Sequence, residues 1–371
     1  MRIKIIILII IAAVIGVFLI NRGGEDEIIV VTGEPAETAA ESVKVIAEGL
    51  EIPWDIAFLP YGDLLVTERP GRLVRIDVDG TRTQIPVESV RHAGEGGLLG
   101  LVLHPNFTQN NWLYIYLSSP EAGGETINRV EQYKLVNNIL TKKKIIIDNI
   151  PGAPYHDGGR IEFGPDDKLY ISTGDATRPE IAQDLNSLGG KILRLNENGT
   201  SEVYSYGHRN PQGLAWDNKG NLWETEHGPS AVVFPNCCQD ELNLIKPGAN
   251  YGWPDSVGDK VLTETIAPAL HSGRDTWAPA SLVYWKNPDA SVGAGSLFFG
   301  GLKGEALYEA VLDGDKVREL KTHFKNEFGR IRTVRIGPDN MLYITTSNRD
   351  GRGAVRTGDD KIIRINPRFL D

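Results

Sequence analysis

The sequence of 371 residues contains only two cysteines, Cys237 and Cys238, and they are adjacent. A chain this poor in cysteine has no disulfide framework. In an oxidising compartment the pair can close a strained vicinal disulfide, and two buried thiols are the alternative that the sequence leaves open. The His and Cys spacing that is typical of zinc sites is also absent.

Basic residues are scarce relative to acidic ones. Lys and Arg number 39 against 49 Asp and Glu, which gives a formal net charge of −10. A protein that binds nucleic acid needs an excess of positive charge to neutralise phosphates. We therefore expect no nucleic-acid partner.

Helical periodicity is nearly absent after residue 42. The 41 glycines and 21 prolines are interleaved with short β-rich runs, which indicates many turns between strands rather than low-complexity sequence. With 41% hydrophobic residues, the chain is long enough for two ordinary domains or for one large all-β domain.

The N-terminus is the one long hydrophobic stretch. After a short basic start, apolar residues run unbroken from Ile5 to Ile20, which is long for a signal-peptide core and slightly short for an upright membrane span. The sequence favours an uncleaved membrane-anchor helix in residues 1–22, with a cleaved signal peptide as the alternative. Both place the remaining chain outside the cytoplasm. Residues 23–42 then predict a flexible tether.

One strand-turn-strand pattern recurs along residues 43–371. Each copy has an apolar run, a turn of Pro, Gly or Asp, and a second β-rich run. The six copies are PWDIAFLPYGDLLVTER at 53–69, GGLLGLVLHPNFTQNNWLYIYLSS at 96–119, GGRIEFGPDDKLYISTGD at 158–175, PQGLAWDNKGNLWETEHGP at 211–229, a weaker copy at 279–304, and IRTVRIGPDNMLYITTSNRDG at 331–351.

Two more β-rich runs follow the first copy, so the repeating unit has four strands. Four antiparallel strands that recur at intervals of roughly 45 to 65 residues are typical of a β-propeller, whose closed ring leaves only short sheet edges. The sequence predicts an all-β fold, a six-bladed β-propeller in residues 43–371. Two β-sandwiches are the weaker alternative, because they need no such regular repeat.

Both ends of an antiparallel hairpin lie on the same side, so the residues that flank the six hairpins are expected to share one face. His156 stands there beside a carboxylate, and imidazole is a common general base, although an ordinary loop histidine is the alternative. Four cations are also expected on this face: Arg209, Lys303, Arg330 and Arg332. Guanidinium groups bind carboxylates or phosphates bidentately, so this cluster predicts an anionic ligand, with structural ion pairs as the alternative.

The segment EHGPSAVVFPNCCQDELNLIKPGANYGWP at 226–254 combines carboxylates with Gly-Pro carbonyls. Oxygen ligands of this kind suit Ca²⁺. A plain long loop is the alternative.

The hairpin copies at 53–69, 96–119, 158–175 and 331–351 are specific motifs, and so are YGHRNPQGLAWD and DELNLIKPGANYGWP. Together they make residues 45–368 resemble the soluble pyrroloquinoline-quinone (PQQ)-dependent glucose dehydrogenases. The resemblance is greater to the aldose sugar dehydrogenases of the glucose/sorbosone dehydrogenase family. It implies a six-bladed propeller that holds PQQ in a funnel, with Ca²⁺ bridging cofactor and protein.

The same resemblance implies roles for single residues. His156 would take the proton of the anomeric hydroxyl while hydride moves to PQQ, and Arg209 would stabilise developing negative charge. Asp175 would orient His156, so we expect the two within hydrogen-bonding reach, with Asp166 and Asp167 on the opposite face.

The resemblance also implies which residues contact the cofactor and which residues bind calcium. The implied cofactor contacts, besides Arg209, are Glu95, Asn210, Lys303, Arg330, Arg332 and Asn348. The implied calcium ligands are the Gly228 and Pro229 carbonyls at a catalytic ion, and Glu241 and the Tyr251 carbonyl at a structural ion, with Asp240 as an additional ligand. Two positions depart from the family pattern: Glu95 replaces the usual glutamine, and Ser347-Asn348 replaces the usual aspartate.

The expected activity is oxidation of the C1 hydroxyl of aldose sugars to lactones by a membrane-tethered, outward-facing quinoprotein. We expect the electrons to pass to a separate acceptor. We also expect the protein to be a monomer or a weak dimer. The alternatives are a calcium-dependent lactonase and a non-catalytic binding propeller.

Overall fold

The computed structural model describes residues 15–22, 25–32, 42–121, 123–196, 199–229, 237–288 and 295–370. It divides into two compact units, Met1–Val43 and Lys44–Asp371.

In the N-terminal unit, strand β1 (Ile15–Arg22) pairs antiparallel with β2 (Glu25–Thr32). The membrane-anchor helix predicted for residues 1–22 is therefore not seen in its described part, and residues 1–14 lie outside the described residues. The isoleucines and valines of this segment are β-branched, a class that favours strands. The tether predicted for residues 23–42 contains β2. Among the residues that the structure describes, none lies in a helix long and apolar enough to cross a membrane.

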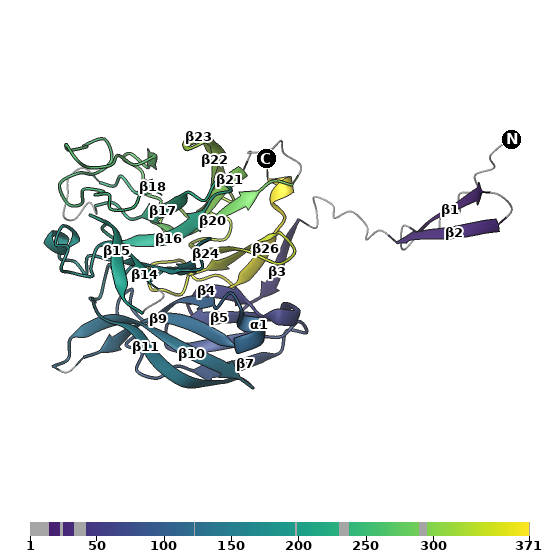
Figure 1. The fold of residues 1–371 in the computed structure, drawn as a ribbon, viewed down its shortest axis with the longest axis horizontal. Helices are drawn as coiled ribbons and strands as arrows, with labels where there is room; N and C mark the ends of the chain where they lie inside the picture. The colour runs from purple at the N-terminus through teal and green to yellow at the C-terminus, as the bar shows by residue number, and fades with distance from the viewer. Residues whose placement is uncertain are drawn as a thin grey trace. The chain divides into compact units, whose positions relative to one another are not determined.

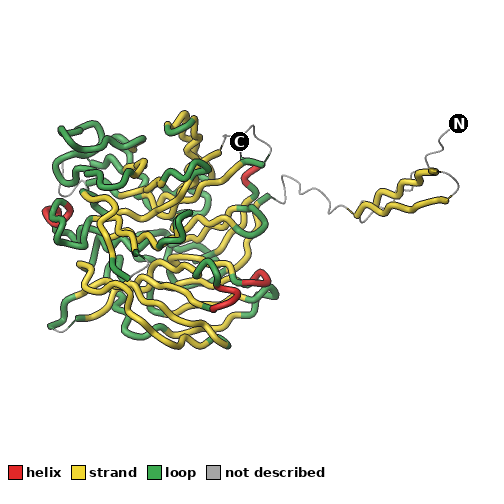
Figure 2. Tube along the Cα trace, in the orientation of Figure 1, coloured by secondary structure: helices red, strands yellow, loops and turns green. Residues whose placement is uncertain are grey.

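The described part of Lys44–Asp371 is built from six four-stranded antiparallel sheets, as the repeat predicts (Figure 1). Strands dominate this unit, and its helices are single short turns (Figure 2). The strands are, blade by blade, β4 (Pro53–Phe58), β5 (Leu64–Glu68), β6 (Arg72–Ile76) and β7 (Arg82–Pro86); β8 (Leu98–Leu103), β9 (Trp112–Pro120), β10 (Thr126–Val136) and β11 (Ile139–Pro151); β12 (Ile161–Phe163), β13 (Leu169–Thr173), β14 (Lys191–Leu195) and β15 (Ser201–Tyr206); β16 (Pro211–Trp216), β17 (Leu222–Glu226), β18 (Glu241–Ile245) and β19 (Leu270–His271); β20 (Pro279–Lys286), β21 (Gly295–Gly301), β22 (Ala306–Asp313) and β23 (Lys316–His323); β24 (Ile331–Ile336), β25 (Leu342–Thr346), β26 (Ile362–Ile365) and β3 (Val43–Ala47). The helices are α1 (Phe107–Asn110) and the 3-10 turns Pro60–Gly62, Pro179–Ala182 and Pro367–Phe369.

All six predicted hairpins are present as the first two strands of the six blades. The first strands contact one another in a ring, from β4 through β8, β12, β16, β20 and β24 back to β4. Blade 6 takes its fourth strand, β3, from the N-terminal side of blade 1, and β3 lies beside β26 (Figure 1). The repeat alone did not reveal this closing strand.

The core consists of hydrophobic clusters between neighbouring blades. The described residues contain six such clusters, one for each blade interface. Between blades 1 and 2, for example, Leu65 and Leu73 pack with Leu113 and Ile115. Full burial of one such side chain contributes roughly 1.5–3 kcal/mol. The second strands of the blades are therefore almost completely buried, whereas outer strands such as β7 and β23 are largely exposed.

A charge network joins three blades where their first strands meet. Asp55 on β4 accepts hydrogen bonds from the Arg335 Nε (2.8 Å) and Nη2 (2.7 Å) atoms on β24. It also forms an ion pair with Arg160, next to β12, while Arg335 reaches Glu162 on β12. Burial alone would raise the pKa of Asp55, but the Arg160 and Arg335 guanidiniums hold that pKa below its ordinary value. The Asp55 charge therefore stabilises the fold at neutral pH, and this contribution is lost as pH falls through the lowered pKa.

Replacing Asp55 with alanine is expected to lower the free energy of unfolding by about 3–5 kcal/mol, because it leaves two buried guanidiniums without their shared partner. Urea unfolding of the full chain measures the loss. The exposed Asp313 at the end of β22 gives a matched control, Asp313→Ala, expected within about 0.5 kcal/mol of the parent. A loss below about 1 kcal/mol for Asp55→Ala would show that the network does not hold the blades.

Candidate active site

The ends of the hairpins meet on one side of the propeller, which we call the hairpin-end face. The Asp175 N–H donates to the Arg209 carbonyl at 2.8 Å, and the Gly158 N–H donates to Asn210 Oδ1 at 3.0 Å. These contacts join segments before and after the inner strands of blades 3 and 4. The turn with Asp166 and Asp167 connects β12 to β13 at their other end, as predicted.

His156 and Asp175 form a direct pair, with 2.7 Å between His156 Nδ1 and Asp175 Oδ1. The Asp175 carboxylate is fully buried, and 18% of the His156 side chain is exposed. The second carboxylate oxygen accepts a hydrogen bond from Trp253 Nε1 at 2.8 Å. Because Nδ1 faces a carboxylate, it carries the proton, which leaves Nε2 as the basic nitrogen of His156.

The backbone of His156 is held in the left-handed region, with φ of 64°. Its carbonyl accepts a hydrogen bond from the Ala176 N–H at 3.1 Å. Gly174 passes so close that a Cβ at that position would lie 1.8 Å from the His156 carbonyl oxygen. A glycine is therefore required beside this histidine, because no side chain fits there.

Three arginines on the hairpin-end face are buried without an acidic partner. Arg69, Arg209 and Arg332 are 3%, 7% and 5% exposed, and none of them forms an ion pair with a described residue. Each also has an Nε atom without a hydrogen-bond partner in the described part of the chain. Burial lowers the pKa of all three, and that of Arg332 falls to about 9, with the charge of Arg69 as the next cause.

Buried cations without a direct ion pair are costly, so this arrangement fits an anionic ligand. Arg69 is the last residue of the first hairpin copy at 53–69, so it was expected on this face, but it was not among the four predicted cations. The available signal was its position directly after the second strand of a hairpin, like that of Lys303.

The other two predicted cations have different surroundings. Arg330 donates from Nε (2.9 Å) and Nη2 (2.8 Å) to Asp350 Oδ2, so the ion-pair alternative holds for this residue. The Lys303 side chain is exposed. Neither belongs to the buried arginine group.

The two predicted asparagines also differ. Asn210 is fully buried and its Nδ2 has no partner among the described residues, so it retains a donor for a ligand. Asn348 instead accepts from the Arg330 N–H and donates to the Phe328 carbonyl and to Asp359, each at 2.9 Å. The side chain of Asn348 is thus committed to holding the loop, which does not favour the predicted cofactor contact.

Glu95 has a cationic partner that the sequence did not reveal. Arg352 Nη1 lies 2.6 Å from Glu95 Oε1. Burial alone would raise the pKa of Glu95, but His227 and Arg352 bring it down to about 2. His227 was also missed: its Nε2 donates to the Pro279 carbonyl at 2.9 Å, and burial lowers its pKa to about 3.

A small cavity of about 10 Å³ lies among most of the predicted calcium ligands. Its lining includes Gly228, Pro229, Glu241 and Tyr251, together with Arg209, Glu226 and His227. This volume holds one water molecule or one ion. Burial and the Glu226 carboxylate raise the pKa of Glu241 to about 8, so a cation would be needed to keep Glu241 ionised near neutral pH. The donor set fits Ca²⁺.

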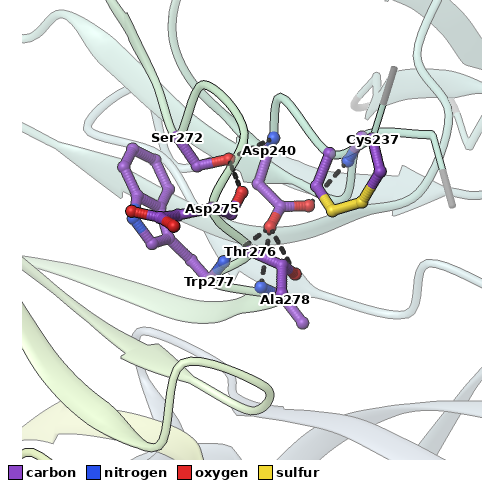
Figure 3. Close-up of a disulfide and its surroundings, with 9 residues drawn as sticks. Cys237, Asp240, Ser272, Asp275, Thr276, Trp277 and Ala278 are labelled. Carbon is purple, nitrogen blue, oxygen red and sulfur yellow. Dashed lines mark hydrogen bonds between the residues drawn. A yellow bond between two sulfur atoms is a disulfide. The ribbon is translucent and has the colours of Figure 1, made fainter. Parts of the chain in front are cut away.

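Asp240 has a structural role instead of lining this cavity. Its Oδ1 accepts from the Gly228 N–H at 2.9 Å, and its Oδ2 accepts from the N–H groups of Trp277 (2.7 Å) and Ala278 (2.8 Å) (Figure 3). Cys237 and Cys238 form a disulfide next to this carboxylate (Figure 3), which decides between the two states left open by the sequence.

A buried group of His208, Glu224 and Glu226 was not predicted. Their candidate ligand atoms lie within 4.8 Å of one another, and Asn243 Nδ2 donates to both glutamates. The signal was the alternation of Glu224 and Glu226 on one face of β17.

Comparison with known proteins identifies the family of the chain. The glucose/sorbosone dehydrogenase family description matches residues 50–363. The chain is 30% identical over 370 residues to an aldose sugar dehydrogenase of Escherichia coli, a match that covers 90% of this chain and 95% of that one. It is 33% identical over 261 residues to quinoprotein glucose dehydrogenase B of Acinetobacter calcoaceticus, over 58% of this chain and 53% of that one.

A solved structure of the PQQ-bound aldose sugar dehydrogenase of Streptomyces coelicolor superimposes with a TM-score of 0.78. It is 37% identical and covers 88% of this chain and 98% of its own. By the extent of the family match and of these similarities, the chain belongs to the glucose/sorbosone dehydrogenase family.

Proposed function

We propose that the protein is a PQQ- and Ca²⁺-dependent dehydrogenase that oxidises the C1 hydroxyl of aldose sugars to lactones. The observation that carries this proposal is the group of three buried guanidiniums, Arg69, Arg209 and Arg332, which have no ion pair among the described residues. PQQ has three carboxylates, so its charge would compensate these cations. The relatives named above as quinoprotein and PQQ-bound enzymes support the same cofactor.

Asp175, His156 and Arg209 have different roles in the proposed reaction. Asp175 holds His156 Nδ1, so His156 Nε2 accepts the proton of the sugar C1 hydroxyl. When bound, PQQ would accept the C1 hydride, and Ca²⁺ at the Gly228 and Pro229 carbonyls would act as a Lewis acid. Arg209 lies over the Trp253 ring, 5.3 Å from its centroid, which orients the guanidinium toward developing negative charge.

The enzyme also needs a location and an electron acceptor. The basic start and the apolar run at residues 5–20 support a location outside the cytoplasm, tethered to the membrane. An external electron acceptor completes the catalytic cycle, and we expect a monomer or weak dimer.

The two rival functions fit the site less well. A calcium-dependent lactonase has no need for three buried arginines without ion pairs. A binding propeller has no use for a buried Asp175 that fixes the tautomer of His156. A redox enzyme with an anionic cofactor uses both features.

The first test is reconstitution of the purified full chain with PQQ and Ca²⁺, followed by aldose-dependent reduction of an artificial dye. His156→Ala is expected to lower kcat by about 10²–10⁴-fold, because the general base is removed, with PQQ affinity nearly unchanged. His104→Ala, at the turn between β8 and β9 on the opposite side, is the matched control. No aldose-dependent reduction by the parent protein would refute the proposed function, and full activity of His156→Ala would refute the role of this residue.

The arginine group predicts opposite effects on binding and on stability. Arg69→Met and Arg332→Met are each expected to weaken PQQ binding by about 10–100-fold, since each removes a charged hydrogen bond of about 1.5–3 kcal/mol. The same variants should leave the Tm of the cofactor-free protein unchanged or higher, because a buried unpaired charge is lost.

Fluorescence titration with PQQ and thermal unfolding measure the two effects. Arg330→Met serves as the contrasting control, since it breaks the ion pair with Asp350 and should lower the Tm. Lower Tm values for Arg69→Met and Arg332→Met without loss of PQQ affinity would assign these arginines to the fold instead of the ligand.

A further inference from the structure

We propose that Glu95 and Arg352 form a positioning pair that holds the backbone of His156 and sets the charge beside its imidazole. The inference deepens the proposed function, because it assigns two positioning residues to the proposed base. Neither residue is proposed to touch the reacting atoms.

The pair connects three blades. Glu95 precedes β8 of blade 2, Arg352 follows β25 of blade 6, and His156 precedes β12 of blade 3. Glu95 Oε1 accepts from Arg352 Nη1 at 2.6 Å, and Glu95 Oε2 accepts from the His156 N–H at 3.3 Å. One carboxylate therefore ties the loop of blade 6 to the segment that carries the base.

Glu95 binds this segment through its backbone as well as its side chain. The Glu95 N–H donates to the Pro154 carbonyl at 2.7 Å, two residues before the bond to the His156 N–H. Gly94 packs so tightly that a Cβ there would lie 2.0 Å from the Pro154 oxygen. Glu95 thus clamps the chain on both sides of Tyr155.

The clamp acts on a backbone that needs support. His156 has a φ of 64°, in the left-handed region that residues other than glycine seldom adopt. Its N–H is bound by Glu95 and its carbonyl by Ala176, so both flanking peptide groups are fixed. This fixes the direction in which the imidazole leaves the chain and lets Nδ1 reach Asp175.

Arg352 supplies the direct opposite charge to Glu95. Its guanidinium lies over the Tyr155 ring, 5.4 Å from the ring centroid, and half of its side chain is exposed. The charged and titratable groups that interact with His156 are Asp175, Glu95 and His227, and the buried Asp157 follows it in the chain. Among the described cations around Glu95, Arg352 is the one that forms an ion pair with it.

The test follows the titration of His156 by NMR in the cofactor-free full chain with ¹⁵N-labelled histidine, using His156→Ala to assign its signal. Glu95→Gln keeps the shape but removes a negative charge, so the titration midpoint of His156 should fall by about 0.5–1 pH unit. Arg352→Gln removes the ion-pair partner of Glu95 and with it a positive charge near His156, so the midpoint should rise by a similar amount. The double variant should return close to the parent.

Conservative and distant variants separate charge from packing. Arg352→Lys retains the charge and should restore the midpoint, whereas Arg318→Gln, an exposed arginine on β23, should not change it. In the reconstituted enzyme, Glu95→Gln should lower kcat by about 2–10-fold with KM within about 3-fold, because the less basic His156 is a weaker general base while the sugar still binds.

Midpoints that move in the same direction in Glu95→Gln and Arg352→Gln, or that do not move, would overturn the inference. The NMR result does not depend on PQQ or on activity. An inactive parent enzyme with opposite midpoint shifts would therefore refute the proposed function and leave the positioning pair in place.

Discussion

The Asp55 carboxylate is the charge on which the arrangement of the blades depends. It lies on the first strand of blade 1 and binds Arg160 of blade 3 and Arg335 of blade 6. Hydrophobic clusters fill every blade interface, but burial of apolar surface has no preferred direction. A buried ion network has strict geometry and a large cost when one member is removed, so it fixes how the first strands of separate blades meet.

In the candidate site, next to this network of paired charges, buried arginines have no ion-pair partner among the described residues. Trp54 contacts one arginine of each kind: Arg160, paired with Asp55, lies 4.4 Å from a Trp54 ring centroid, and the unpaired Arg332 lies 5.6 Å away. The paired network and the packed blades provide a rigid frame that can hold unpaired cations at a cost in stability. Such cations are already in place when an anionic ligand arrives, which is how preorganised sites gain affinity and catalytic power.

Much of the site could be predicted because the hairpin repeat defines which residues share a face. Antiparallel pairing predicted that His156 and Asp175 share one face, and the family resemblance implied the contact that the structure shows. Partner choice could not be predicted: Arg330 binds Asp350, whereas Arg332, two residues later, has no acidic partner among the described residues. The two arginines look equivalent in the sequence, and only the surrounding loops distinguish them.

The sequence by itself determined the six blades, their inner hairpins and the face on which the polar ends gather, because alternation and turns are local properties of the chain. The tertiary structure decided how the ring closes, with β3 beside β26, and that Arg352 neutralises Glu95. It also showed strand β1 where the apolar sequence had predicted a helix. These contacts join residues hundreds of positions apart or depend on pairing partners, and local sequence patterns carry no information about such distances.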